Sequence, residues 1–308
     1  MRFESSKVIT IICILLLSLT TVMTSCSPSV NPKVDIQERE NTTVSEKKQS
    51  AKSSMLKKRK KENKELKPGK VKVVKNKYRE IIENSFKDIN AYQSSGIYSF
   101  VNEAGFETEN SQEPFVSASV VKLFIAEYTL LCIDSGDLSY DSIINGQSVR
   151  NLLTSMITVS DNSAANAFID HFGMDTLNES FISKGYTATK IERRMLDFAA
   201  QQNGKENYTS THDVMMLLKK IYLSQSLSAY SDLLDIMKRQ QIKTKIQLNL
   251  PPGVTAANKT GELSNVENDV GIIFTPDGDY AVCFLLNKVT ANSSARKAIS
   301  DCVNMLCE

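Results

Sequence analysis

The segment Val116–Ile125 constrains the fold of this chain more than any other stretch. It reads as the end of an extended segment, then the first turn of a helix at Ser119, and then a helix that is apolar almost all round. A serine and a lysine three residues apart on a helix project from one face, so the amine of Lys122 can reach the hydroxyl of Ser119. A lysine can take the proton of a serine hydroxyl if burial and nearby cations lower its pKa toward neutrality. The segment therefore predicts a nucleophile with its base on a buried helix.

The spacing S-x-x-K alone is a weak signal, because it begins at four serines: Ser45, Ser54, Ser119 and Ser294. Only Ser119 opens a helix that is apolar enough to be buried. Two later tripeptides, each present once, follow it in order: Ser-Asp-Asn at 160–162 and Lys-Thr-Gly at 259–261. Either tripeptide by itself reads as a helix cap or as a strand edge with a turn. Their ordered combination with Ser119 instead favours a catalytic site.

The three motifs together are the signature of class A β-lactamases and penicillin-binding proteins, and residues 78–308 resemble this group of serine hydrolases. The resemblance implies a mixed α/β (α+β) fold, in which an antiparallel sheet is flanked by the N- and C-terminal helices. A helical subdomain would occupy about residues 119–250. The implied reaction is acyl transfer through a covalent intermediate, on a β-lactam or a D-alanyl-D-alanine peptide, without a metal or an organic cofactor.

The same resemblance assigns the catalytic steps to motif residues. Ser119 would attack the substrate carbonyl, and Lys122 would accept its proton directly or through water. Ser160 would pass a proton to the leaving nitrogen. The oxyanion hole would use the backbone N–H groups of Ser119 and Glu262, which are donors that need no reorganisation during the reaction.

Substrate binding is assigned in the same way. Asn162 would hold the substrate amide, and Lys259 and Thr260, followed by Gly261, would bind the substrate carboxylate. Lys259 would also help to lower the pKa of Lys122, because a nearby positive charge disfavours a second one.

The chain departs from the class A pattern between the second and third motifs. Class A β-lactamases carry a loop there with a glutamate that activates the deacylating water. Matching residues 191–199 to that loop places Met195 where the glutamate should be, and a methionine cannot take a proton. The nearby acids are Glu192, on the wrong side of Arg193, and Asp197, two residues late. Acylation with slow deacylation is therefore expected.

Three functions stay open on these residues. A β-lactamase is the first, and a D-alanyl-D-alanine carboxypeptidase or another penicillin-binding type of cell-wall hydrolase is the second. The third is a non-catalytic, wall-sensing lipoprotein that keeps the pocket. An enzyme is favoured by the intact set of Ser119, Lys122, Ser160 and Lys259, because a protein that only binds has no need of the base.

The N-terminus reads as an export signal. A short polar start with Arg2 and Lys7 precedes the apolar segment Val8–Met23, and small residues then lead to Cys26. The pattern predicts a signal peptide at 1–25, because the apolar core is short for a membrane span. It resembles a bacterial lipobox, which would leave Cys26 as the lipidated first residue. We expect a lipid anchor on the extracellular face of the bacterial cell membrane, with a plainly secreted protein as the alternative.

Residues 27–77 are expected to form a disordered basic tether, because they lack aromatic residues and apolar periodicity. Residues 1–77 hold 18 Lys and Arg against 7 Asp and Glu, a net charge of +11, whereas the remainder holds 19 against 28, a net charge of −9. Such a tether can lie along anionic lipid or wall polymer. We expect a monomer and no nucleic-acid partner, because an exported chain rarely meets nucleic acid.

The catalytic domain reads as a helical middle between two parts that contain strands. The N-terminal part is expected to hold a helix at 78–92, a strand at 96–101 and a hairpin region at 102–113. Helices are then expected at 119–133, 146–157, 162–173, 174–184, 211–221 and 228–240. Strands at 254–260, 270–275 and 280–289 precede a last helix at 293–307.

The cysteines of this domain are Cys132, Cys283, Cys302 and Cys307. Cys283 on a strand could pair with Cys302 or Cys307 on the last helix in an oxidising compartment, and buried free thiols are the alternative. No C-x-x-C pair or His-rich cluster indicates a metal site.

Overall fold

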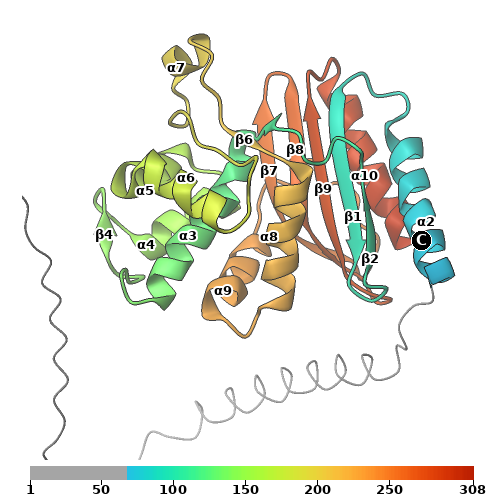
Figure 1. The fold of residues 1–308 in the computed structure, drawn as a ribbon, viewed down its shortest axis with the longest axis horizontal. Coiled ribbons are helices and arrows are strands. Elements are labelled where there is room, and N and C mark those ends of the chain that lie inside the picture. The colour runs from blue at the N-terminus through green and yellow to red at the C-terminus, as the bar shows by residue number, and fades with distance from the viewer. Residues whose placement is uncertain (1–67) are drawn as a thin grey trace, which may run out of the picture. The chain divides into compact units, whose positions relative to one another are not determined.

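The structure is a computed structural model that describes residues 68–308 (Figure 1). The predicted signal peptide at 1–25, the lipidated Cys26 and most of the tether at 27–77 lie outside the described residues and stay predictions. Within residues 68–308, no helix is both long enough and apolar enough to cross a membrane.

The centre of the domain is a five-stranded antiparallel sheet in the order β2-β1-β9-β8-β7. Its strands are β1 (Tyr92–Ser99), β2 (Ala104–Glu107), β7 (Thr255–Leu263), β8 (Val266–Phe274) and β9 (Tyr280–Asn287). The first and last parts of the chain are therefore joined in one sheet, because β1 pairs with β9. The predicted hairpin region after β1 is confirmed, because β1 pairs antiparallel with β2. The strand β7, which carries the Lys-Thr-Gly motif, lies at one edge.

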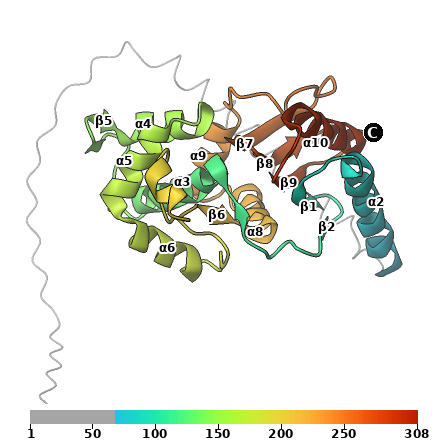
Figure 2. The same cartoon turned by 90° about the horizontal axis from the view of Figure 1, so that it is seen from above.

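The terminal helices α2 (Pro68–Phe86) and α10 (Asn292–Cys307) cover one face of this sheet (Figure 2). Ile82, Val303 and Phe284 belong there to one buried apolar cluster, in which the rings of Phe86 and Phe284 are in contact. The helix α2 begins ten residues before the predicted boundary at 78. A proline suits the first turn of a helix, and Val74 extends the buried stripe toward the N-terminus, so the helical pattern starts within the predicted tether.

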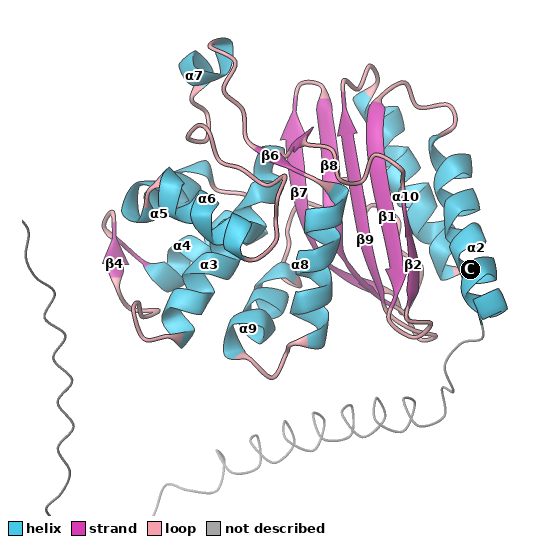
Figure 3. Ribbon diagram, in the orientation of Figure 1, coloured by secondary structure: helices cyan, strands magenta, loops and turns pink. Residues whose placement is uncertain are grey.

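The other face of the sheet is covered by α8 (Thr211–Leu223), and α9 (Ser228–Met237) contacts β7 (Figure 3). The remaining helices from the middle of the chain form a helical region beside the sheet, and they are α3 (Lys122–Asp134), α4 (Val149–Thr158), α5 (Asn162–Phe172), α6 (Met174–Ser183) and α7 (Phe198–Gln202). Short strands pair as β3 (Phe115–Val116) with β6 (Tyr208–Thr209) and as β4 (Ile143–Ile144) with β5 (Gln147–Ser148). The fold is thus the predicted sheet with flanking terminal helices and a helical insert.

The helix α3 is buried on nearly every side, as its sequence predicts. Leu123, Phe124, Ile125 and Ala126 are all fully buried. A helix that is apolar all round can sit only inside the protein, so α3 forms the centre of the helical region. Its burial holds the motif of Ser119 and Lys122, at its N-terminus, in a fixed position.

The four described cysteines are free. Cys283 belongs to the core between the sheet and the helical region, whereas Cys302 belongs to the core under the terminal helices. The two therefore lie on opposite faces of the sheet, and a disulfide between them is not possible without rearrangement. Of the two alternatives, free thiols are the state in this structure.

Candidate active site

The nucleophile predicted at Ser119 lies in a short 3-10 helix, η1 (Ala118–Val121), which runs into α3. Side chains three residues apart lie on the same side of a 3-10 helix, so Ser119 and Lys122 share a face. Ala118 has a φ of 46°, a left-handed conformation that turns the chain sharply just before the serine. Ser119 is half-buried, whereas Val120 and Val121 are fully buried. The serine is thus held at a turn, partly open to solvent.

Two asparagines on the sheet hold the strand that precedes the serine. Asn268 donates to the carbonyl oxygens of Val116 and Ser117 at 2.9 Å and 3.1 Å. Asn287 accepts from the backbone N–H of Val116 at 2.8 Å. These bonds tie β3 and η1 to β8 and β9, so the position of Ser119 depends on the rigid sheet.

The amine of Lys122 points to the Ser-Asp-Asn motif. It donates to the carbonyl oxygen of Ser160 at 2.7 Å, to the hydroxyl oxygen of Ser160 at 3.2 Å and to the side-chain oxygen of Asn162 at 2.8 Å. These three acceptors match the three N–H donors of a lysine ammonium. Among residues 68–308, the hydrogen bonds of Lys122 do not include one to Ser119, so of the two predicted routes for the proton, direct or through water, the direct one is not formed in this structure.

Burial lowers the pKa of Lys122 to about 7, against the negative charge of Asp161, which raises it. Burial is therefore what lowers the pKa of Lys122, whereas a contribution from Lys259 was expected. Burial also lowers the pKa of Lys259 well below its ordinary value, and the charge of Lys122 acts in the same direction there. A substantial share of Lys122 is thus neutral near pH 7 and able to accept a proton.

The hydroxyl oxygen of Ser160 is the point where the two lysines meet. Lys259 donates to it at 2.9 Å, and also donates to the carbonyl oxygen of Thr260 at 2.7 Å. Ser160 has a φ of 59°, which is unusual for a residue other than glycine. The next residue, Asp161, caps α5 through its side chain, as predicted. The strained turn and the cap together aim Ser160 at both amines.

Gly261 allows β7 to approach the nucleophile closely. A Cβ atom at this position would lie 2.8 Å from the carbonyl oxygen of Ser117 and 3.2 Å from the backbone nitrogen of Ser119. The first distance is shorter than real Cβ atoms show, and the second is an unusually tight contact. The glycine of the Lys-Thr-Gly motif is therefore required by the packing of β7 against η1.

The loop that contains Met195 is held at its backbone by an asparagine of α5. The side chain of Asn166 accepts from the N–H of Met195 at 2.7 Å and donates to its carbonyl oxygen at 3.1 Å. The methionine side chain itself is buried. Since Asn166 is one helical turn from Asn162, the clamp places Met195 beside the Ser-Asp-Asn motif.

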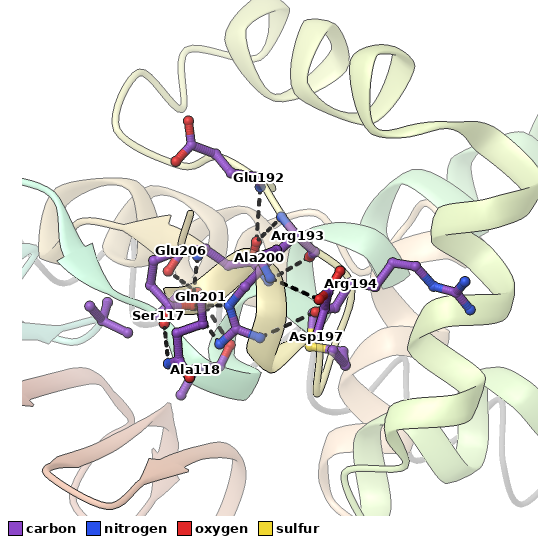
Figure 4. A network of polar contacts seen from close by, with 12 residues as sticks. Ser117, Ala118, Glu192, Arg193, Arg194, Asp197, Ala200, Gln201 and Glu206 are labelled. Atoms are coloured by element: carbon purple, nitrogen blue, oxygen red, sulfur yellow. Dashed lines mark hydrogen bonds and ion pairs between the residues drawn. The ribbon is translucent and has the colours of Figure 1, made fainter. Parts of the chain in front are cut away.

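A buried ion pair closes this loop at its base. Arg193 contacts Glu206 at 2.7 Å, and both side chains are almost fully buried. Figure 4 shows the two side chains pointing toward one another. Asn207 accepts from the backbone N–H groups of Glu192 and Arg193, and its own carbonyl oxygen accepts from the N–H of Ser117. The loop is thereby connected to the segment that carries the nucleophile.

The two acids nearest to Met195 are engaged elsewhere. Glu192 pairs with Lys190 at 2.6 Å, and its side chain points away from the buried pair in Figure 4. Asp197 accepts from the backbone N–H of Ala200 at 2.9 Å and so caps α7. Neither acid therefore supplies the carboxylate that Met195 lacks.

The structure thus brings together Lys122, Ser160, Asn162 and Lys259 through direct hydrogen bonds, and it packs Gly261 against the backbone of Ser119. Four asparagines that support this arrangement were not predicted from the sequence, and they are Asn166, Asn207, Asn268 and Asn287. Among the residues that the structure describes, no group of His, Cys, Asp or Glu could hold a metal ion.

Comparison with known sequences gives a consistent picture. The beta-lactamase enzyme family matches residues 135–307, more than half of the chain, although the match begins after Lys122. A curated beta-lactamase from Streptomyces cellulosae is 26% identical over 145 residues. That match spans 45% of this chain and 47% of the relative, so it covers about half the length of that protein.

Solved structures with the same fold include β-lactamases and a penicillin-binding protein. A mutant of PBP-A, described as an acyl-enzyme complex with penicillin G, has a TM-score of 0.68 at 23% identity and covers 75% of this chain and 94% of its own. A beta-lactamase from Chitinophaga pinensis has a TM-score of 0.69 at 20% identity and covers 74% of this chain and 97% of its own. At these identities the likeness establishes the fold.

Proposed function

Because the chain belongs to the beta-lactamase enzyme family, we propose that it is a serine hydrolase that forms an acyl-enzyme on Ser119 and releases it slowly. The acyl donor would be a β-lactam or a D-alanyl-D-alanine peptide. The observation that carries this proposal is the convergence of Lys122 and Lys259 on the hydroxyl oxygen of Ser160, beside the half-buried Ser119.

In acylation, neutral Lys122 takes the proton of the Ser119 hydroxyl, directly or through a water molecule, as the serine oxygen bonds to the carbonyl carbon. The pKa of about 7 makes the neutral amine available. As the carbon–nitrogen bond breaks, Ser160 gives its hydroxyl proton to the leaving nitrogen. The ammonium of Lys122, 3.2 Å from that oxygen, returns a proton to Ser160, so the protons balance.

Two backbone donors would stabilise the negative charge that develops on the carbonyl oxygen. These are the N–H groups of Ser119 and Glu262, on the two segments that Gly261 allows to pack closely. Asn162 would hold the substrate amide, and Lys259 and Thr260 would bind a substrate carboxylate. Burial lowers the pKa of Lys259, and a bound carboxylate would favour its charged form, because an opposite charge offsets the cost of burying the cation.

Deacylation needs a second base to activate water, and Met195 cannot serve. Glu192 and Asp197 are engaged by Lys190 and by α7, as described above. This favours the penicillin-binding type of activity over rapid β-lactam hydrolysis. A mutant of PBP-A with the same fold is described as an acyl-enzyme complex with penicillin G.

The proposal is tested by incubating the full chain with benzylpenicillin, measuring the intact mass, and mapping the modified peptide. We expect one adduct, located on Ser119 and absent from Ser119→Ala. An adduct on another residue, or none on the wild type, would contradict the proposal. The absence of any adduct would favour the non-catalytic, wall-sensing alternative.

A further inference from the structure

Glu262 follows the Lys-Thr-Gly motif directly, and three cationic or hydroxyl groups surround its carboxylate. One oxygen accepts from the ammonium of Lys245 and, at 3.0 Å, from the hydroxyl of Thr244. The other lies 3.5 Å from the guanidinium of Arg296. The Glu262 side chain is 35% exposed, whereas that of Lys245 is fully buried.

This carboxylate lies close to the expected site of the substrate carboxylate. Thr260 and Glu262 are two residues apart on β7, so their side chains lie on the same face of the strand, about 7 Å apart. A ligand carboxylate bound to Thr260 would therefore approach the groups that now hold Glu262. A carboxylate surrounded by a lysine, an arginine and a hydroxyl is the arrangement that these donors would also offer to an external anion.

A second glutamate neutralises one of the two positive charges of this cluster. Glu267 is directly opposite Glu262 in the β7–β8 register, is fully buried, and contacts Lys245 at 2.9 Å and Arg296 at 2.8 Å. Like charges that face each other across two strands repel, so the two cations must neutralise both acids. Without the charge of Glu262, Lys245 and Arg296 together would carry one positive charge in excess.

We propose that Thr244, Lys245 and Arg296 form an anion subsite that Glu262 occupies from within the chain, and that a substrate carboxylate must displace this side chain to bind there. The proposal rests on the proposed function, because it concerns the acyl donor of the same site. Partial burial by itself would raise the pKa of Glu262, but Lys245, Thr244 and Arg296 together lower it, which agrees with a bound, ionised carboxylate. Its exposure permits the side chain to swing out, whereas Glu267 has no such freedom.

Because Glu262 already fills this subsite, we expect the protein to discriminate poorly between acyl donors with and without a free carboxylate. In the wild type, the gain from binding an anionic substrate is offset by the loss of the bonds to Glu262. Benzylpenicillin and its methyl ester should therefore acylate the wild type with similar efficiency. Removal of the internal carboxylate should create a preference for the acid.

The test compares second-order acylation rate constants for the acid and the ester, measured by intact mass on the full chain. In Glu262→Gln, the ratio of acid to ester should rise at least threefold, mainly through the acid. In the matched control Glu267→Gln, which removes the buried partner and keeps Glu262, the ratio should not rise. Glu262→Ala serves as a second variant, and a thermal melt shows that each protein is folded.

This experiment distinguishes failure of the anion subsite from failure of the proposed function. An adduct that forms on the wild type, with the same acid-to-ester ratio in Glu262→Gln and Glu262→Ala, would overturn the anion subsite and leave the proposed function standing. An equal rise in Glu267→Gln would overturn it as well, because a general change of charge would then explain the effect. If no variant forms an adduct, both the function and the subsite are overturned.

Discussion

Lys122 and Lys259 donate to the same atom, the hydroxyl oxygen of Ser160, at 3.2 Å and 2.9 Å. Two buried amines on one hydroxyl repel when both are charged, so burial and mutual repulsion favour a state in which one is neutral. This relationship links the first and third motifs through the second. It explains why the three motifs are informative together and weak alone.

The rate of acylation should depend on pH through Lys122. Its pKa is lowered to about 7, and only the neutral amine can accept a proton from Ser119. The acylation rate constant should therefore rise with pH up to about 7 and level off above it. Stopped-flow measurement with a chromogenic β-lactam between about pH 5 and about pH 9 tests this. A profile that falls over this range would contradict the role of Lys122 as the base.

Met195→Glu should shorten the lifetime of the acyl-enzyme. A carboxylate at this position, held beside Asn166, can activate water, and a positioned general base contributes at least about a hundredfold in rate. The matched control is Met195→Gln, which has the same shape but no basic carboxylate. The adduct lifetime after removal of free penicillin gives the result. Equal lifetimes for the two variants would show that the missing base is not what limits deacylation.

Replacement of Arg193 should unfold the loop around Met195, whereas replacement of its neighbour should not. Arg193→Ala leaves Glu206 as a buried, unpaired charge and should cost about 3 kcal/mol or more of unfolding free energy. Arg194→Ala breaks only an exposed pair with Asp170 and should cost less than about 1 kcal/mol. Urea denaturation and limited proteolysis within 191–207 measure the difference. Similar costs for both variants would contradict this view of the loop.

Glu127→Gln should stabilise the protein at alkaline pH. Burial raises the pKa of Glu127, and one of its oxygens has no hydrogen-bond partner within residues 68–308, although Tyr186 and Tyr230 donate to the other. A folded-state pKa above the unfolded value gives stability at low pH that is lost as pH rises through the folded pKa. The stability of the wild type should therefore fall more than that of the variant between about pH 5 and about pH 8. Denaturation curves of the wild type and Glu127→Gln at both pH values give the two free energies of unfolding, and an equal fall in both proteins would contradict this prediction.

Gly261→Ala should impair acylation more than stability. The added Cβ would lie 2.8 Å from the carbonyl oxygen of Ser117, so β7 must move away from η1. A displacement of about 1 Å between reacting groups can cost about a hundredfold in rate. Acylation kinetics together with a thermal melt measure both effects. A variant that reacts at the wild-type rate would show that this close approach does not matter for the reaction.

The elements that the sequence predicts best are those with a strong local pattern. The helix after Ser119 is apolar all round, Asp161 precedes an alanine-rich stripe as a cap, and Gly173 ends that helix with a φ of 82°. Each signal lies within a few residues of the feature it predicts. The longer helices, the strands of the main sheet and the motif positions could therefore be predicted from the chain itself, whereas the short elements β4, β5, β6 and α7 were not predicted.

The supporting contacts of the site were not predictable in the same way. Asn166 meets Met195 29 residues later, and Asn268 meets Val116 152 residues away. No periodicity connects such pairs, because only the tertiary fold brings them together. One signal was available: Asn268 lies among polar residues inside a strand and Asn287 ends an apolar strand, and a buried amide in a sheet needs a partner.

The most direct test of the central claim is the lifetime of the adduct on the wild-type chain. After brief reaction with benzylpenicillin and removal of the free compound, the intact mass is followed over time, with Ser119→Ala as the control. The account predicts an adduct on the wild type alone that persists for minutes or longer, because Met195 provides no base. An adduct that is lost within seconds would contradict slow deacylation, and the absence of an adduct would contradict acylation at Ser119.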